Sequence, residues 1–271
     1  MLIRDNFKTE QFIKNELQEY EKVHLESLER IRNGIIPPER IQIVEGYFTG
    51  HFLSLIRIKY SLGYPIEDLV PDYMEALKYF KMSWVEQRLQ TTKRGKTKIY
   101  KQYKYLDIVY EILSLGILLK VDKEALQWII DITDEYGIVD HILEYLFCKL
   151  DKSRIAKTKE TYEDIFYIPM KYERIRSAIE CIGSDESMMY LQEFIEDDFL
   201  NYDYKMKVLD VKPDPKVDGN YRYWCWLVAA IVAGEKMDDT IDCLENSIYG
   251  SLRDVPYYPK DMVDWCLGRI D

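Results

Sequence analysis

The sequence is short of the residue types from which metal sites, disulfide frameworks and catalytic triads are built. Its 271 residues include only 3 histidines. No histidine has the H-x-x-x-H or H-E-x-x-H spacing that places two zinc ligands on one helix face. The cysteines form no C-x-x-C pair, and they are Cys148, Cys181, Cys225, Cys243 and Cys266. An odd number of widely spaced cysteines predicts reduced thiols. We therefore expect no metal and no cofactor.

Motifs for nucleophilic catalysis and for phosphate binding are also missing. The chain has no G-x-S-x-G motif, although a catalytic triad assembled in space from distant residues stays open. The stretch KRGKT at Lys93 to Thr97 resembles the end of a phosphate-binding loop. That motif requires a glycine at position 90, where this chain has Gln90, and it requires a preceding strand. We predict a solvated basic turn instead, which could pair with acidic residues of this chain or touch a partner.

No hydrophobic run is long enough for a membrane helix. One uncharged run, from Tyr223 to Ala233, is 11 residues long, whereas a bilayer requires about 20. Apolar residues occupy every angle around it, which predicts a core helix buried on all sides. The first ten residues, MLIRDNFKTE, contain no continuous apolar h-region of the kind that a signal peptide has. We therefore expect no secretory signal, no membrane partner and a cytoplasmic location.

Positive charge is scarce, and the shortage is uneven. Aspartate and glutamate total 48 against 37 lysines and arginines, for a net charge of -11. From Cys181 to Asp271 there are 19 acidic and 9 basic residues, whereas from Lys81 to Tyr110 there are 2 and 8. Such a chain is repelled by nucleic acid and by anionic membranes and attracted to a basic protein surface. The alternative is that the acidity only maintains solubility.

Hydrophobic residues recur at helical spacing along most of the chain, and strand-like alternation never exceeds a few residues. This pattern predicts an all-α fold. Gly137 is expected to end one helix, and Ser184 to cap the start of another. The predicted helices cover approximately residues 5–31, 37–62, 71–84, 99–119, 123–136, 138–150, 169–182, 184–200, 221–234 and 260–267.

A charged stretch, DKSRIAKTKE, follows Leu150, and Pro169 comes soon after it. We take this as a domain boundary, so that residues 1–150 and 151–271 form two helical halves packed together. The second half would then contain the buried, aromatic-rich helix.

Clustered carboxylates are the remaining candidates for chemistry. Paired carboxylates can bind a divalent metal, so a helical hydrolase with a carboxylate-held metal is one hypothesis. Adjacent residues on a helix point in different directions, which favours an exposed acidic surface. Asp238 and Asp239 also suit a helix N-terminus, where the dipole favours negative charge. The candidate partner-binding residues are Glu196, Asp197, Asp198, Asp238, Asp239 and Asp254.

The histidines His24 and His51 lie on or beside the apolar stripes of the first two predicted helices. We expect both imidazoles to be partly buried and hydrogen-bonded rather than to act as ligands.

A resemblance to a known family is carried by four stretches. Two of them resemble the N-terminal domain of the PoNi immunity proteins: RDNFKTEQFIKNELQEYEK at Arg4 to Lys22 and KYSLGYPIEDLVPDYMEALKYF at Lys59 to Phe80. Two others resemble that family's C-terminal domain: NYRYWCWLVAAIVAGEKMDD at Asn220 to Asp239 and PYYPKDMVDW at Pro256 to Trp265. They occur in the family's order, which assigns residues 1–150 and 151–271 to the two family domains.

The resemblance implies a cytoplasmic, all-helical antitoxin that binds and neutralises a cognate toxin with a PoNe-type DNase domain. Such toxins are delivered between competing bacteria. The leading hypothesis is therefore a non-catalytic nuclease inhibitor that binds a basic protein through its acidic surface and does not bind nucleic acid itself. A helical adaptor with a different protein partner is the alternative, followed by the metal hydrolase. The 23 tyrosines could also supply a homodimer face.

Overall fold

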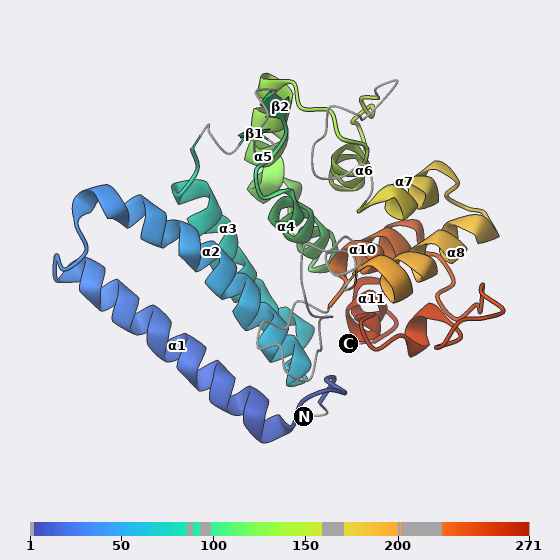
Figure 1. The fold of residues 1–271 in the computed structure, drawn as a ribbon, viewed down its shortest axis with the longest axis horizontal. Helices are drawn as coiled ribbons and strands as arrows, with labels where there is room; N and C mark the ends of the chain where they lie inside the picture. Colours follow the sequence, from blue (N-terminus) through green and yellow to red (C-terminus); the bar gives the residue numbers. More distant parts are fainter. Residues whose placement is uncertain are drawn as a thin grey trace. The chain divides into compact units, whose positions relative to one another are not determined.

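The computed structural model describes residues 3–85, 89–92, 99–158, 171–199, 201 and 224–270. The chain divides into two compact units: unit 1 comprises Met1–Val85 and Asp214–Arg222, and unit 2 comprises Glu86–Pro213 and Tyr223–Asp271. Regular structure among the described residues is helical except for two three-residue strands (Figure 1). The all-α prediction is therefore confirmed.

Unit 1 is built from successive helices that pack on one another. The long helix α2 packs against both α1 and α3. Thr9 caps α1 by accepting a hydrogen bond from the Phe12 amide, and Pro38 occupies the first position of α2, where its missing N–H costs nothing. The elements of this unit are α1 (Glu10–Arg32), α2 (Pro38–Ser61), the 3-10 helix η1 (Ile66–Leu69) and α3 (Val70–Met82).

The α2–α3 pair contains most of the core of unit 1. Its fully buried side chains include Ile56, Tyr60, Tyr73 and Ala76. By contrast, α1 buries only Ile13 and Leu17, so its attachment depends on a narrow stripe against α2.

The two histidines of unit 1 meet within that stripe. The His24 ring on α1 stacks on the His51 ring of α2 with centroids 5.0 Å apart, and Phe48 and Phe52 contact His24 edge-on. Both imidazoles are partly buried, as predicted. The predicted hydrogen bonds are wrong for two ring atoms: within the described chain, His24 Nδ1 and His51 Nε2 are buried without a partner. Burial lowers the pKa of His51 to about 4, assisted by His24, and burial also lowers the pKa of His24.

Unit 2 is organised around α10, as the uncharged run predicts. Every residue from Trp224 to Ala233 is buried, and α4 and α11 pack against this helix. The Cys225 amide donates to the Tyr257 carbonyl at 2.9 Å, which joins the start of α10 to the aromatic turn at residues 257–259. The helices of this unit are α4 (Leu106–Leu118), α5 (Lys123–Tyr136), α6 (His141–Leu150), α7 (Glu173–Glu180), α8 (Asp185–Glu193), the π-helical segment η3 (Phe194–Phe199), α10 (Trp226–Glu235), the 3-10 helix η4 (Leu252–Asp254) and α11 (Lys260–Cys266).

Both predicted caps are present in unit 2. Gly137 ends α5 in the left-handed conformation with φ +68°, which a residue with a side chain adopts only at a cost. The Ser184 side chain accepts a hydrogen bond from the Ser187 amide and so starts α8.

The fourth helix does not begin where the sequence predicts. Ile99–Lys101 is a strand, β2, which pairs antiparallel with β1 (Gln90–Thr92), and α4 starts only at Leu106. A strand this short forms only with its pairing partner, which a periodicity within one stretch does not show. The predicted basic turn at residues 93–97 lies outside the described residues.

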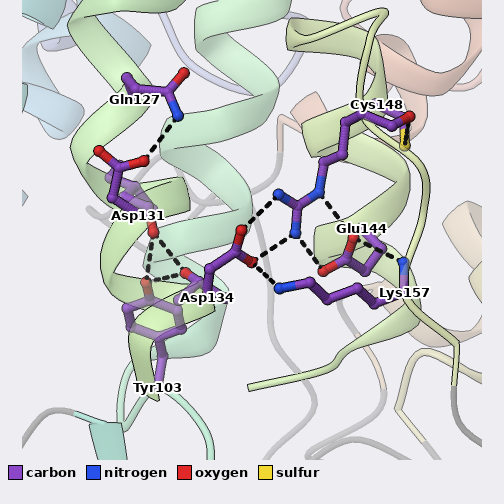
Figure 2. Close-up of polar contacts among 10 residues, drawn as sticks. Tyr103, Gln127, Asp131, Asp134, Glu144, Cys148 and Lys157 are labelled. Atoms are coloured by element: carbon purple, nitrogen blue, oxygen red, sulfur yellow. Dashed lines mark hydrogen bonds and ion pairs between the residues drawn. The ribbon is translucent and has the colours of Figure 1, made fainter. Parts of the chain in front are cut away.

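The charged stretch after α6 is bound to the two helices that precede it, α5 and α6 (Figure 2). The Arg154 guanidinium donates to both carboxylate oxygens of Asp134 on α5 and to both of Glu144 on α6, at 2.7 to 2.9 Å. Hydrogen bonds from Arg154 and Lys157 hold the pKa of Asp134 at about 2. The proposed boundary at residues 150/151 thus lies inside unit 2, where α6 also packs against α7. The assignment of residues 1–150 and 151–271 to two family domains stays a prediction.

The His24–His51 stack predicts that unit 1 loses stability in mild acid. An unfolded histidine titrates near pH 6.5, so between about pH 6.5 and 4 the unfolded chain binds more protons than the folded one. The free energy of unfolding therefore falls as the pH falls through this window, by about 2 kcal/mol for the partly exposed His51. Urea unfolding at pH 7.5 and pH 4.5 should show a smaller pH dependence for His51→Phe than for the wild type.

Tyr20→Phe is the matched control, because the Tyr20 ring also stacks on His51 but carries no imidazole. This variant should retain the wild-type pH dependence. Equal pH dependence in the wild type and His51→Phe would contradict the assignment.

Candidate interaction surface

Two stretches of unit 2 contain no lysine or arginine, and the fold brings them together. They are residues 181–199, which include α8 and η3, and residues 237–252, which follow α10. The second stretch includes an irregular segment, residues 238–250, which we call the acidic loop. Its contacts with α8 and η3 are described below, and its helical surroundings can be followed in Figure 1.

The acidic loop begins at a buried charge cluster. Asp239 is 0% exposed, and its carboxylate accepts hydrogen bonds from the Tyr258 hydroxyl at 2.9 Å and from Arg253 at 3.0 Å. Arg269 lies 3.4 Å from the same carboxylate. Arg253 also pairs with Asp264 on α11 at 2.6 Å. A single aspartate therefore joins the start of the loop to η4 and to the chain before and after α11, and Arg253 extends the cluster to α11 itself.

The pKa of Asp264 reflects this cluster. Burial acts to raise it, but hydrogen bonds from Arg253 and Arg269 hold it below its usual value. Both arginines thus act on carboxylates inside unit 2, and their charge is offset there.

The acidic loop ends at a second polar cluster. Gln192 of α8 is 0% exposed, and its amide nitrogen donates to the Ser247 hydroxyl at 2.9 Å and to the Gly250 carbonyl. The Ser247 hydroxyl donates to Glu196 of η3 and accepts from the amides of Tyr249 and Gly250 at 3.1 Å. These contacts bind the end of the loop to α8 and η3.

Between its two ends the loop is folded into short turns. Asp238 accepts from the Thr240 amide at 3.0 Å, and Asp242 accepts from the Leu244 amide at 3.2 Å. The Ser247 amide in turn donates to the Leu244 carbonyl at 2.9 Å. Side chains that satisfy nearby amides in this way favour defined turns. The acidic loop is therefore an ordered structure held at both ends.

Exposed carboxylates lie on the loop and on the neighbouring helices α8 and η4, and we call them the acidic patch. Asp185 lies close to Cys243. Burial raises the pKa of the Cys243 thiol, and the negative charges of Asp185 and Asp242 raise it further. Asp254 and Asp242 both lie next to Gly250. A Cβ atom on Gly250 would be 3.3 Å from the Asp254 carboxylate and 4.0 Å from the Asp242 carboxylate. Among the described residues no ion pair involves the members of the patch, which are Asp185, Glu186, Asp242, Glu245 and Asp254.

The structure separates the carboxylates nominated from the sequence into different roles. Asp239 is buried and does not present charge at the surface. Asp197 and Asp198 pair with Arg174 of α7, at 3.4 and 2.7 Å, and Glu196 accepts from Ser247. The remaining two, Asp238 and Asp254, are exposed, although each caps a local turn.

The expectation that Asp238 and Asp239 start a helix is wrong. The chain leaves α10 through Lys236, which has φ +55°, and residues 238–246 form no helix. Asp238 bonds Thr240, two residues later, and Asp239 turns inward to its arginines. Local hydrogen bonds of this kind compete with helix formation.

Sequence reasoning missed Asp185, Glu186, Asp242 and Glu245. Their signal was present, because they lie in the two stretches without any basic residue. Sequence reasoning selected the adjacent pairs at 197–198 and 238–239 instead. Arginines of unit 2 offset much of the charge of these pairs.

The described residues contain no group of three or more histidine, cysteine, aspartate or glutamate side chains able to hold a metal ion. Within the same ranges, no helix combines the length and the apolar character that crossing a bilayer requires. The geometry of the region is that of an ordered acidic surface.

Comparison with known proteins finds one family. Residues 4–131 match the family described as PoNe immunity protein (PoNi), N-terminal. Over these residues the chain is similar to the PoNi family. The match begins in unit 1 and extends into unit 2, to α5. It confirms the resemblance seen in residues 4–22 and 59–80, whereas the resemblance of residues 220–239 and 256–265 to the PoNi C-terminal domain stays a prediction.

A solved structure shows the same fold over nearly the whole chain. It is the crystal structure of protein PA2201 from Pseudomonas aeruginosa, with a TM-score of 0.61 and 17% sequence identity. The alignment covers 99% of this chain and 92% of PA2201. A search of curated proteins found no match.

The buried position of Asp239 predicts that it stabilises unit 2. Asp239→Asn would keep the shape of the side chain but leave the positive charge of Arg253 and Arg269 with only Asp264 to offset it. Breaking a buried ion pair in this way typically costs about 3 kcal/mol, which urea unfolding would measure. Asp238→Asn is the control, because among the described residues this exposed neighbour accepts hydrogen bonds only from Thr240 and adds only a weak attraction to Arg269, so its loss should change stability little. An Asp239→Asn protein as stable as the wild type would show that the cluster does not hold the loop.

Proposed function

We propose that this protein neutralises a toxin with a PoNe-type DNase domain by binding it through the acidic patch, without catalysing any reaction. The observation that carries the proposal is the family match over residues 4–131, since PoNi proteins are immunity proteins for PoNe toxins. The acidic patch supplies a surface with the charge that such a partner requires.

The charge of a nuclease explains why an acidic surface would inhibit it. A DNase holds the phosphates of DNA with a positively charged groove, and nonspecific affinity for DNA is mostly electrostatic. A protein that covers such a groove must offer negative charge that is not already offset by its own basic residues. The acidic patch has this property, because no ion pair among the described residues involves its five carboxylates.

Charge at this surface would also speed the encounter. Electrostatic steering raises association rates by about 10- to 1000-fold, and the effect declines as salt screens the charges. Rapid capture suits an inhibitor whose target cuts chromosomal DNA. Within this proposal the protein acts in the cytoplasm, where that DNA lies.

Not all of the nominated residues fit the proposed contact. Asp254 belongs to the patch, and Asp238 and Asp197 are exposed and remain candidates beside it. Glu196 and Asp198 are half-buried and bonded to other residues, so they would act mainly by holding the loop and η3 in place. Asp239 would act only as the buried support of the loop.

The direct test is to mix the purified protein with the nuclease domain of a PoNe-type toxin, sought first in the adjacent gene. We expect a stoichiometric complex and a loss of DNA cleavage. Absence of both would refute the proposal. Binding to that nuclease without loss of cleavage, or binding only to another protein, would favour an adaptor, and chelator-sensitive hydrolysis of phosphoesters would favour a metal hydrolase.

Charge reversal predicts a kinetic effect on this complex. Replacing Asp185, Glu186, Asp242 and Glu245 by lysine changes the net charge by +8, from four residues at two charges each. We expect the association rate constant at low salt to fall by about 10- to 100-fold and its salt dependence to flatten. Stopped-flow or surface-binding kinetics at 20 and 200 mM salt would measure both.

A matched variant separates a local effect from one of total charge. Four exposed glutamates on α1, in unit 1, allow the same change of +8, and they are Glu19, Glu21, Glu26 and Glu29. Their replacement by lysine should slow association much less. If both variants slowed association equally, the acidic patch would not form the interface. The proposal that this protein inhibits the nuclease would then still stand.

A further inference from the structure

The acidic loop exposes two apolar side chains, Ile241 near its start and Ile248 near its end. Ile248 is 83% exposed and Ile241 is 43% exposed, although the loop around them is ordered. Single exposed isoleucines are common on proteins and need no explanation. Exposure alone therefore does not distinguish Ile248, as the 89% exposure of Ile155 in the same unit shows.

The fixed backbone on both sides of Ile248 is what distinguishes it. Ser247, immediately before it, bonds Gln192 and Glu196, and the amides of Tyr249 and Gly250 after it bond Ser247. The backbone is thus held in place by the buried side chain of Gln192. A side chain presented on a pre-organised backbone loses less conformational entropy on binding than one on a free loop.

The second distinguishing feature is charge. Residues 237–252 contain no lysine or arginine, and the carboxylates of Asp242 and Glu245 lie on the same loop as Ile248. An apolar side chain in such surroundings suits a partner whose basic surface encloses an apolar pocket. Interfaces commonly place an apolar anchor at the centre and charged residues at the rim.

We infer that Ile248 is the apolar anchor of the interface, inserting into a pocket on the positively charged face of the nuclease domain, with Ile241 beside it. This inference rests on the proposed function. The acidic patch governs the encounter, and Ile248 governs how long the complex lasts, because buried apolar contact acts mainly on dissociation.

The test compares two isoleucines that are equally exposed in the same unit. Ile248→Asp and Ile155→Asp each add one negative charge at an exposed site. Binding kinetics to the same purified nuclease domain should show at least 50-fold faster dissociation for Ile248→Asp, with association changed less than threefold. Ile248→Ala should speed dissociation about 10-fold, and Ile155→Asp should match the wild type. Circular dichroism would verify that all three variants fold.

The outcomes separate this inference from the proposed function. Tight binding by the wild type with unchanged dissociation for Ile248→Asp overturns the anchor alone. Equal acceleration by Ile155→Asp also overturns it, because added charge would then explain the effect. Failure of the wild type to bind the nuclease overturns both the proposed function and the anchor.

Discussion

The acidic region of unit 2 depends on one buried carboxylate. Asp239 sits at the point where the chain leaves α10, and it is held by Tyr258, Arg253 and Arg269. An isolated buried charge costs several kcal/mol, so the carboxylate is stable only where these partners surround it. That requirement fixes the start of the acidic loop relative to η4 and α11. The loop can then bend outward and return to Ser247 without a helix of its own.

The carboxylates of unit 2 described above fall into two populations. One population binds arginines that each hold more than one carboxylate: Arg154 holds two, and Arg174 holds up to three. Their charge is largely offset inside unit 2, where it orders the structure. The other population lies in stretches that contain no basic residue, and so it remains at the surface. The net charge of -11 therefore does not describe an evenly acidic molecule.

Local signals in the sequence predict local structure, and they fail where contacts with distant residues determine the conformation. Helical periodicity and the caps at Gly137 and Ser184 are properties of neighbouring residues, which is why α5, α8 and α10 could be found. The partners of Asp239 lie 14 and 30 residues further along the chain, and Glu196 meets Ser247 across 51 residues. No pattern within one stretch shows which carboxylates have such partners. The same limit explains β2, because a strand this short forms only with its pairing partner.

Order in the acidic loop is what allows charge and apolar contact to act together in the proposed complex. Long-range attraction between exposed charges is screened within about 8 Å at physiological salt, so it can hasten an encounter but contributes little to the lifetime of the complex. Apolar contact acts only at close range and requires the side chain to be correctly placed when the surfaces meet. The bonds from Ser247 to Gln192 and Glu196 place it before the partner arrives. A flexible acidic tail would provide the first effect without the second, whereas a loop fixed on a helical support can provide both.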